Sequence, residues 1–104
     1  MKQASLFIVL LKYSAPLDRI DAFRKRHMEF LDKFYSQNTF IASGPQSPRS
    51  GGIIIAKAYS KTEMQEIIQQ DPFVVNNLAT LDIIEFTATK FSDLFSQILD
   101  SKLI

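Results

Sequence analysis

Two segments of the chain, residues 6–11 and residues 53–58, have the length and composition of a buried β-strand. The first is apolar at consecutive positions, and so are the three isoleucines that begin the second. Successive side chains of a strand point to opposite faces of its sheet, so a strand without polar alternation is apolar on both faces. We therefore expect a sheet that needs cover on both faces.

Residues 17–37 have the spacing of one long amphipathic helix. Apolar side chains recur there at intervals of three and four residues, with charged residues between them. Asn38 suits the exit of this helix, and residues 39–43 are predicted to form a short second strand. A polar loop at residues 46–52 then joins two neighbouring antiparallel strands.

The second half of the chain predicts another helix and another strand. Ser60 and Glu63 make a capping-box pattern, in which the two side chains satisfy free N–H groups at a helix start. Asp71 followed by Pro72 interrupts that helix, because the residue before a proline is disfavoured in helical conformation. Residues 81–87 are predicted to form the fourth strand.

A terminal helix is predicted at residues 92–103, capped by Ser92. The element order is then strand-helix-strand-strand-helix-strand, with this helix added at the end. That order is typical of an α+β, ferredoxin-like fold, in which a four-stranded antiparallel sheet carries both main helices on one face. The second face would stay apolar, so we expect a homodimer packed sheet face to sheet face, with the terminal helix as the competing cover.

Composition narrows the classes of function. With 104 residues and no shift in composition, one domain is expected. The absence of cysteine excludes thiolate chemistry, and with a single histidine the chain lacks the usual ligand set for a transition metal, although oxygen-only Mg²⁺ or Ca²⁺ sites stay open. We therefore expect no cofactor and no zinc, iron or copper.

The charge pattern argues against nucleic acid and membrane partners. The formal net charge is +1, and the basic run Arg24, Lys25 and Arg26 is interpreted as a solvated helix face. The apolar segment at residues 6–11 is too short for a membrane span, and it lacks the small-residue site of a signal peptide. A cytoplasmic protein is expected.

His27 and Asp71 are the candidate catalytic residues. His27, the only histidine, falls on the apolar side of the helix at 17–37, and Asp71 stands at the end of the second helix. Each also has a purely structural interpretation: a partly buried histidine bonded to a backbone carbonyl, and an aspartate that caps the turn begun by Pro72. If the two helices run antiparallel on one sheet face, both side chains lie at similar heights and can meet. A carboxylate on one imidazole nitrogen leaves the other as a general base or acid.

Five short motifs occur in sequence along the chain. They are Arg24-x-x-His27-x-x-Phe30-Leu31, Ala42-Ser43-Gly44-Pro45, Gly51-Gly52-Ile53, Gln70-Asp71-Pro72-Phe73 and Ile83-Ile84-Glu85-Phe86. In their order and separations they closely resemble the motifs of YCII-like proteins. The resemblance covers about residues 6–90 and leaves the terminal helix outside.

This resemblance implies a dimeric α+β barrel fold and an active site with a histidine and an aspartate, matched by His27 and Asp71. One branch of the family resembles dehydrochlorinases of chlorinated hydroxyquinols, and the wider superfamily includes muconolactone isomerases and small monooxygenases. Two departures stand out. Asn77 occupies a position where relatives often carry glycine, and Ser47-Pro48-Arg49 replaces an acidic stretch.

Arg49 and Tyr13 are the candidate substrate-binding residues. A guanidinium on a glycine-flanked loop can hold a carboxylate or enolate, and Tyr13 at the end of the first strand can line the same cleft. An ordinary exposed arginine and an edge tyrosine are the alternatives.

The leading hypothesis is a cofactor-independent lyase or isomerase that moves a proton on a small cyclic or carbonyl-bearing molecule. The rival hypothesis is a non-catalytic domain that binds a small molecule or a protein partner. In that case His27 and Asp71 serve packing and capping.

Overall fold

The computed structural model of the protein describes residues 4–103. It contains four strands and five helices within that range. In chain order they are β1 (Ser5–Tyr13), α1 (Leu17–Ala22), α2 (Arg24–Ser36), β2 (Phe40–Pro45), β3 (Gly51–Ala58), α3 (Lys61–Ile68), α4 (Pro72–Val75), β4 (Ala79–Phe86) and α5 (Asp93–Asp100).

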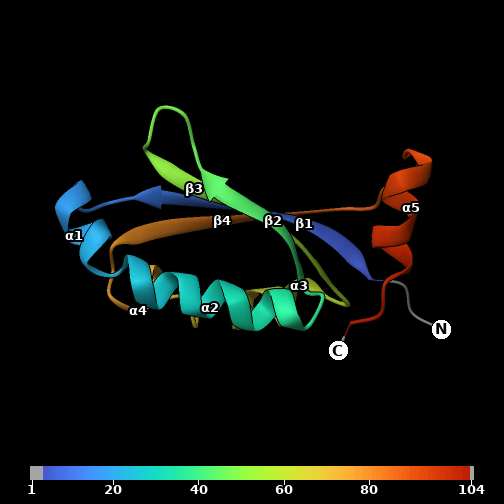
Figure 1. Ribbon diagram of the computed structural model, residues 1–104, viewed down its shortest axis with the longest axis horizontal. Coiled ribbons are helices and arrows are strands. Elements are labelled where there is room, and N and C mark those ends of the chain that lie inside the picture. Colours follow the sequence, from blue (N-terminus) through green and yellow to red (C-terminus); the bar gives the residue numbers. More distant parts are fainter. Residues whose placement is uncertain (1–3, 104) are drawn as a thin grey trace.

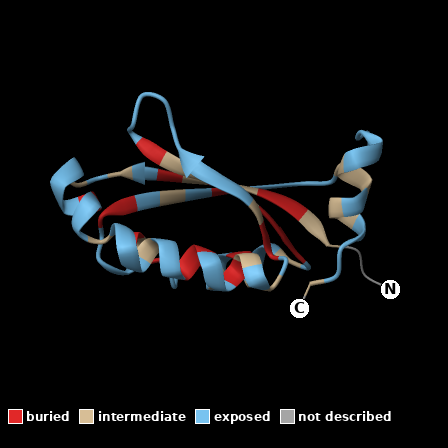
Figure 2. Ribbon diagram, in the orientation of Figure 1, coloured by how far each residue is buried: buried red, intermediate tan, exposed pale blue. Residues whose placement is uncertain are grey.

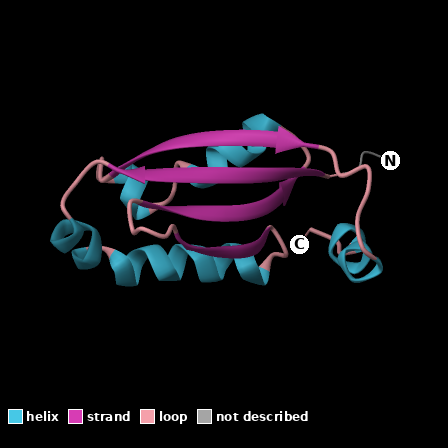
Figure 3. Ribbon diagram, turned by 90° about the horizontal axis from the view of Figure 1, so that it is seen from above, coloured by secondary structure: helices cyan, strands magenta, loops and turns pink. Residues whose placement is uncertain are grey.

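The four strands form one antiparallel sheet in the order β2-β3-β1-β4. Helices α2, α3 and α4 lie against one face of it, as Figures 1 and 3 show from two directions. The central strand β1 pairs with both β3 and β4, and Val9 stands opposite Ile54 on one side and Ile83 on the other. The expected α+β, ferredoxin-like fold is confirmed.

The core lies between the sheet and these helices (Figure 2). Alternate residues of β1, Phe7, Val9 and Leu11, are at most 2% exposed, and they meet Phe30 and Phe34 from α2 in one apolar cluster. Burying a side chain of this size contributes roughly 1.5–3 kcal/mol, so this layer holds α2 firmly against the sheet.

The opposite face of the sheet is apolar as well, which confirms the expectation of strands that are apolar on both sides. Ile84 and Phe86 of β4 point there, and they are 47% and 42% exposed, whereas Ile83, the residue before Ile84, points to the other face and is buried. Helix α5 stands at one end of the sheet and does not extend across this face (Figures 1 and 3). The terminal helix is therefore not a cover for the whole open face.

The helix expected at residues 17–37 is in fact two helices, α1 and α2, and the single-helix prediction was wrong. The break is at Phe23, whose φ of −105° and ψ of 4° leave the helical region. Its N–H bonds to the carbonyl of Ile20 at 3.1 Å, a tight turn that ends α1. Ile20 is thereby buried to 1% exposure, and this packing outweighs the continuous helical pattern.

Local signals at the other helix ends are confirmed. Ser60 Oγ accepts the N–H of Glu63, Ser92 Oγ accepts the N–H of Phe95, and Asn38 leaves α2 with a φ of 59°. Helix α5 ends at Asp100 and not at residue 103 as expected, because the backbone of Ser101 is extended. The ammonium group of Lys57 donates there to the carbonyls of Ile98 and Ser101. Among the described residues, no helix is long and apolar enough to cross a membrane.

Candidate active site

Asp71 is held in place by the short helix that it starts. Pro72 occupies the first turn of α4, where its missing N–H is of no consequence, and Asp71 Oδ1 accepts the N–H of Phe73 at 2.9 Å. The Asp71 side chain is fully buried, with 0% exposure. The capping interpretation of this residue is therefore correct, but capping is not its only contact.

His27 meets Asp71 across the gap between α2 and α4. Its Nδ1 lies 2.9 Å from Asp71 Oδ1, and its ring stacks on Phe73 with centroids 4.1 Å apart and planes 12° from parallel. The side chain is 15% exposed, so one edge of the imidazole reaches the surface of a cavity. Two residues 44 positions apart in sequence are thus brought into contact, as the helical spacing predicts.

The two imidazole nitrogens of His27 have different surroundings: Nδ1 contacts Asp71, and Nε2 does not. An ionised carboxylate only accepts hydrogen bonds, so Nδ1–H donates to Asp71 and Nε2 is left without this partner. Asp71 Oδ2 is buried and receives no hydrogen bond from the described residues. His27 and the Phe73 N–H are therefore the hydrogen-bond partners of this carboxyl group within residues 4–103. Such an arrangement fixes the tautomer of a histidine and stabilises its imidazolium form.

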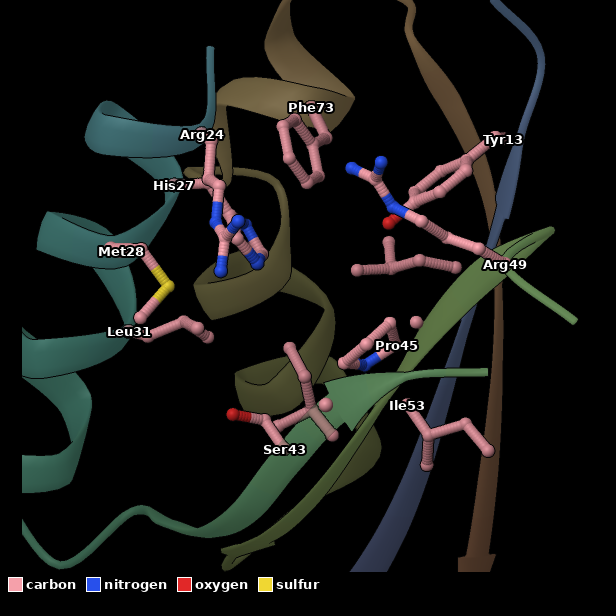
Figure 4. Close-up of a pocket in the computed structure, with 14 residues that line it drawn as sticks. Tyr13, Arg24, His27, Met28, Leu31, Ser43, Pro45, Arg49, Ile53 and Phe73 are labelled. Carbon is pink, nitrogen blue, oxygen red and sulfur yellow. The ribbon is translucent and has the colours of Figure 1, made fainter. Parts of the chain in front are cut away.

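A cavity of about 240 Å³ lies between α2 and the ends of β1, β2 and β3. Figure 4 shows Arg24, His27 and Met28 on the helix side of it, with Tyr13 and Arg49 on the strand side. Most of the remaining lining is apolar. It consists of Leu11, Leu31, Pro45, Ile53, Ile54 and Phe73, together with Ser43, Gly44 and Gly52. A small ring with one or two polar groups is the kind of molecule that such a site fits.

Arg49 lies at the rim of the cavity, where it forms a salt bridge with Asp21 of α1. The hydrogen bond that Arg49 donates to the Asp21 carboxylate raises the pKa of Arg49 and lowers the pKa of Asp21. Both side chains are well exposed, at 38% and 51%. The sequence singled out Arg49 but not its partner, because the pairing depends on how the loop before β3 folds back toward α1.

Gly51 positions the loop that carries Arg49. A Cβ at this residue would stand 1.9 Å from the carbonyl oxygen of Leu11, so only glycine allows β3 to start this close to β1. The Tyr13 N–H donates to the carbonyl of Ser50 at 3.0 Å in the same place. The backbone contact therefore brings Arg49 and Tyr13 to the same side of the cavity.

Arg24 is the lining residue that sequence reasoning missed. All three residues of the basic run are exposed, as expected for a solvated helix face, but Arg24 also lines the cavity. The signal was present in the sequence, since residues three apart on a helix share a face and Arg24 stands three residues before His27.

Among residues 4–103, no three histidine, cysteine, aspartate or glutamate side chains gather into a group that could hold a metal ion. The polar groups that face the cavity are guanidinium, imidazole, phenol and hydroxyl groups. They suit an organic molecule that carries oxygen atoms.

The profile of the YCII-related domain matches residues 6–87, which is most of the chain. This range includes His27, Asp71, Arg49 and Tyr13 and ends before α5. No curated protein matches the sequence significantly.

Solved structures with the same fold have low sequence identity. The 5-chloro-2-hydroxyhydroquinone dehydrochlorinase TftG from Burkholderia phenoliruptrix AC1100, in complex with 2,5-dihydroxybenzoquinone, superposes with a TM-score of 0.72 at 19% identity, over 85% of this chain and 99% of its own. SnoaB from Streptomyces nogalater, a cofactor-independent oxygenase, superposes with a TM-score of 0.52 at 15% identity, over 88% of this chain and 98% of its own. At these identities the likeness establishes the fold.

Proposed function

The chain belongs to the YCII-related domain family, and we propose that it is a cofactor-independent lyase or isomerase acting on a small cyclic or carbonyl-bearing molecule. The observation that carries the proposal is the contact between buried Asp71 and His27 at the wall of a cavity. A histidine whose Nδ1 is held by a carboxylate, and whose ring edge faces a cavity, is equipped for proton transfer.

The proposed reaction starts with removal of a proton from carbon next to a carbonyl or hydroxyl-bearing ring position. The proton goes to His27 Nε2, and the electron pair of the broken C–H bond moves into the substrate as an enolate. Asp71 stabilises the imidazolium that forms. In an isomerisation the same proton returns to a different atom of the substrate. In an elimination the electron pair expels a leaving group, and the imidazolium passes its proton to solvent.

Phe73 supports this chemistry in two ways. Its backbone N–H fixes Asp71 Oδ1, and its ring stacks on the imidazole at 4.1 Å. Tyr13 meets the same Phe73 ring edge-on, with centroids 6.1 Å apart. The apolar ring restrains His27 in one orientation and keeps water from that side of it, which favours a defined direction of proton transfer.

Arg49 and Tyr13 are proposed to bind the substrate from the strand side of the cavity, where Figure 4 places both. The neighbours with this fold support a catalytic role. One is a dehydrochlorinase seen with 2,5-dihydroxybenzoquinone, a molecule of one ring, and the other works without a cofactor. A one-ring molecule is in keeping with a cavity of about 240 Å³.

We also propose that two copies pack through the open sheet face. Ile84 and Phe86 leave an apolar surface there that α5 does not cover, and contiguous apolar surface of this kind marks interaction sites.

The test of function is hydrogen exchange on candidate substrates. Wild-type protein is incubated in D₂O with 5-chloro-2-hydroxyhydroquinone and with small unsaturated lactones, and loss of C–H signals and release of chloride are followed. We expect exchange or chloride release above background, and a decrease of about 10²- to 10⁴-fold in His27→Gln. Equal rates in both proteins, or binding without any exchange, would favour the non-catalytic binding domain.

A further inference from the structure

The ionisable groups facing the cavity are unbalanced in charge. Arg24, Arg49, His27 and Tyr13 line it, and no aspartate or glutamate does. Asp71 does not line the cavity. It is fully buried, and its carboxyl group contacts the imidazole of His27. The cavity therefore has two permanent positive charges and no negative charge of its own.

Arg24 is the unpaired one of the two arginines. Within the described part of the chain the salt bridges are His27 with Asp71 and Arg49 with Asp21, so Arg24 has no carboxylate in contact. Arg24 is exposed and also lines the cavity, so an incoming anion can reach its guanidinium without displacing a carboxylate from it. Guanidinium groups bind carboxylates through paired hydrogen bonds with defined geometry.

Arg49 already binds one carboxylate, that of Asp21. The pKa of Asp21 is lowered first by that bond and further by the charges of Arg49 and Arg24. The pair lies at the rim, where both side chains are well exposed. Ion pairs at such positions contribute little stability and exchange partners readily.

Resting on the proposed function, we propose that the substrate is a small organic anion whose acidic group is bound between Arg24 and Arg49, and that it displaces Asp21 from Arg49. The aspartate serves as a resident counter-ion while the cavity is empty. The apolar body of the ligand then lies against the apolar lining of the cavity beside the His27 ring. Arg24 and Arg49 would thus determine which molecules His27 meets.

The experiment compares benzoate with benzamide, which has the same shape without the charge. Binding to the full chain is followed at fixed ionic strength by the NMR signals of His27, the only histidine, so occupancy is read without turnover. We expect benzoate to bind at least about tenfold more tightly than benzamide. Equal affinities, or no shift of His27 with either probe, would overturn the proposal.

Variants separate the roles of the three side chains. Arg24→Gln and Arg49→Gln should each weaken benzoate binding about tenfold and leave benzamide unchanged, whereas Arg26→Gln, an exposed neighbour in the same run, should have no effect. Asp21→Asn removes the competing carboxylate and should tighten benzoate binding about two- to fivefold. Weaker or unchanged binding in Asp21→Asn would show that Asp21 positions Arg49, and would overturn the displacement.

This readout is independent of catalysis. Anion-selective binding in a protein that exchanges no C–H proton would leave this inference standing and remove the proposed reaction. Exchange of neutral substrates without selectivity for anions would support the proposed reaction and overturn this inference.

Discussion

Two charged side chains are buried among the described residues, Asp71 at 0% and Lys57 at 1% exposure. Asp71 begins α4 and Lys57 binds the end of α5, and these two helices lie at opposite ends of the molecule in Figure 1. Asp71 faces an ionisable side chain that borders a cavity. Lys57 donates to the backbone carbonyls of Ile98 and Ser101 at 2.8 and 2.7 Å, where it holds the end of α5. The two buried residues therefore differ in their partners. Asp71 contacts a side chain that can gain or lose a proton beside the cavity, whereas Lys57 binds backbone carbonyls at the end of a helix.

The two ends also differ in what they share with relatives. The end with His27 and Asp71 lies within the YCII-related domain at residues 6–87, and α5 at residues 93–100 lies beyond it. We interpret the first end as the site of function and the second as a structural addition. The predictions below test that division, from the largest expected effect to the smallest.

The largest effect concerns proton transfer. Asp71→Asn keeps the size of the side chain and its capping ability but removes the charge that stabilises the imidazolium, so C–H exchange should fall by about 10²-fold or more. Lys57→Met keeps a long apolar stem and removes the charge at the other end, and exchange should stay within about twofold of wild type. Stopped exchange in Lys57→Met with the fold intact would contradict the division of the two ends.

The next prediction compares how a lysine substitution on the open sheet face and one on α5 affect the proposed dimer. Light scattering should report twice the chain mass of 11.9 kDa for wild type, and the single mass for Ile84→Lys, because a lysine in the middle of an apolar interface leaves a buried charge. Leu94→Lys on α5, where the side chain is 80% exposed, is the matched control and should remain dimeric. A wild-type monomer at tens of micromolar would end the proposal of sheet-to-sheet packing.

Capping gives a smaller effect, on stability. Asp71→Ala loses the bond to the Phe73 N–H, whereas asparagine keeps a cap of similar quality. Urea unfolding should therefore show Asp71→Ala to be less stable than Asp71→Asn by about 1 kcal/mol. Equal stabilities would mean that the cap contributes nothing and that the start of α4 depends on Pro72 alone.

The smallest expected effect is the contribution of Lys57 to the pH dependence of the free energy of unfolding. Burial lowers its pKa below the ordinary 10.5, partly opposed by the charge of Asp100. The unfolded chain therefore holds this proton more tightly, and the free energy of unfolding should rise with pH between the lowered pKa and 10.5. The difference between wild type and Lys57→Met in urea unfolding isolates this contribution. Parallel pH profiles for the two proteins would show that the Lys57 proton is not coupled to folding.

Much of the fold follows from local patterns in the sequence. The order of elements along the chain and the capped starts of α3 and α5 follow from apolar runs, helical spacing and the hydroxyls of Ser60 and Ser92. The break at Phe23 does not follow from them, because the helical spacing continues across it and only burial of Ile20 against the rest of the fold favours the turn.

The candidate site divides in the same way. The contact of His27 with Asp71 is predictable from their positions on two antiparallel helices. The approach of Asp21 to Arg49 depends on the path of a loop, which local propensity does not determine. The burial of Lys57 depends on residues more than 40 positions later, and the sequence of β3 itself does not indicate it.

The central claim is that Asp71 holds the Nδ1 proton of His27 and leaves Nε2 free for chemistry. Long-range ¹H–¹⁵N correlation spectra of the single histidine measure which nitrogen carries the proton in the neutral ring. We predict protonated Nδ1 and unprotonated Nε2 in wild type, and loss of this preference in Asp71→Ala, with Lys57→Met unchanged. A neutral ring protonated at Nε2 in wild type, or a tautomer indifferent to Asp71→Ala in a folded protein, would contradict the account.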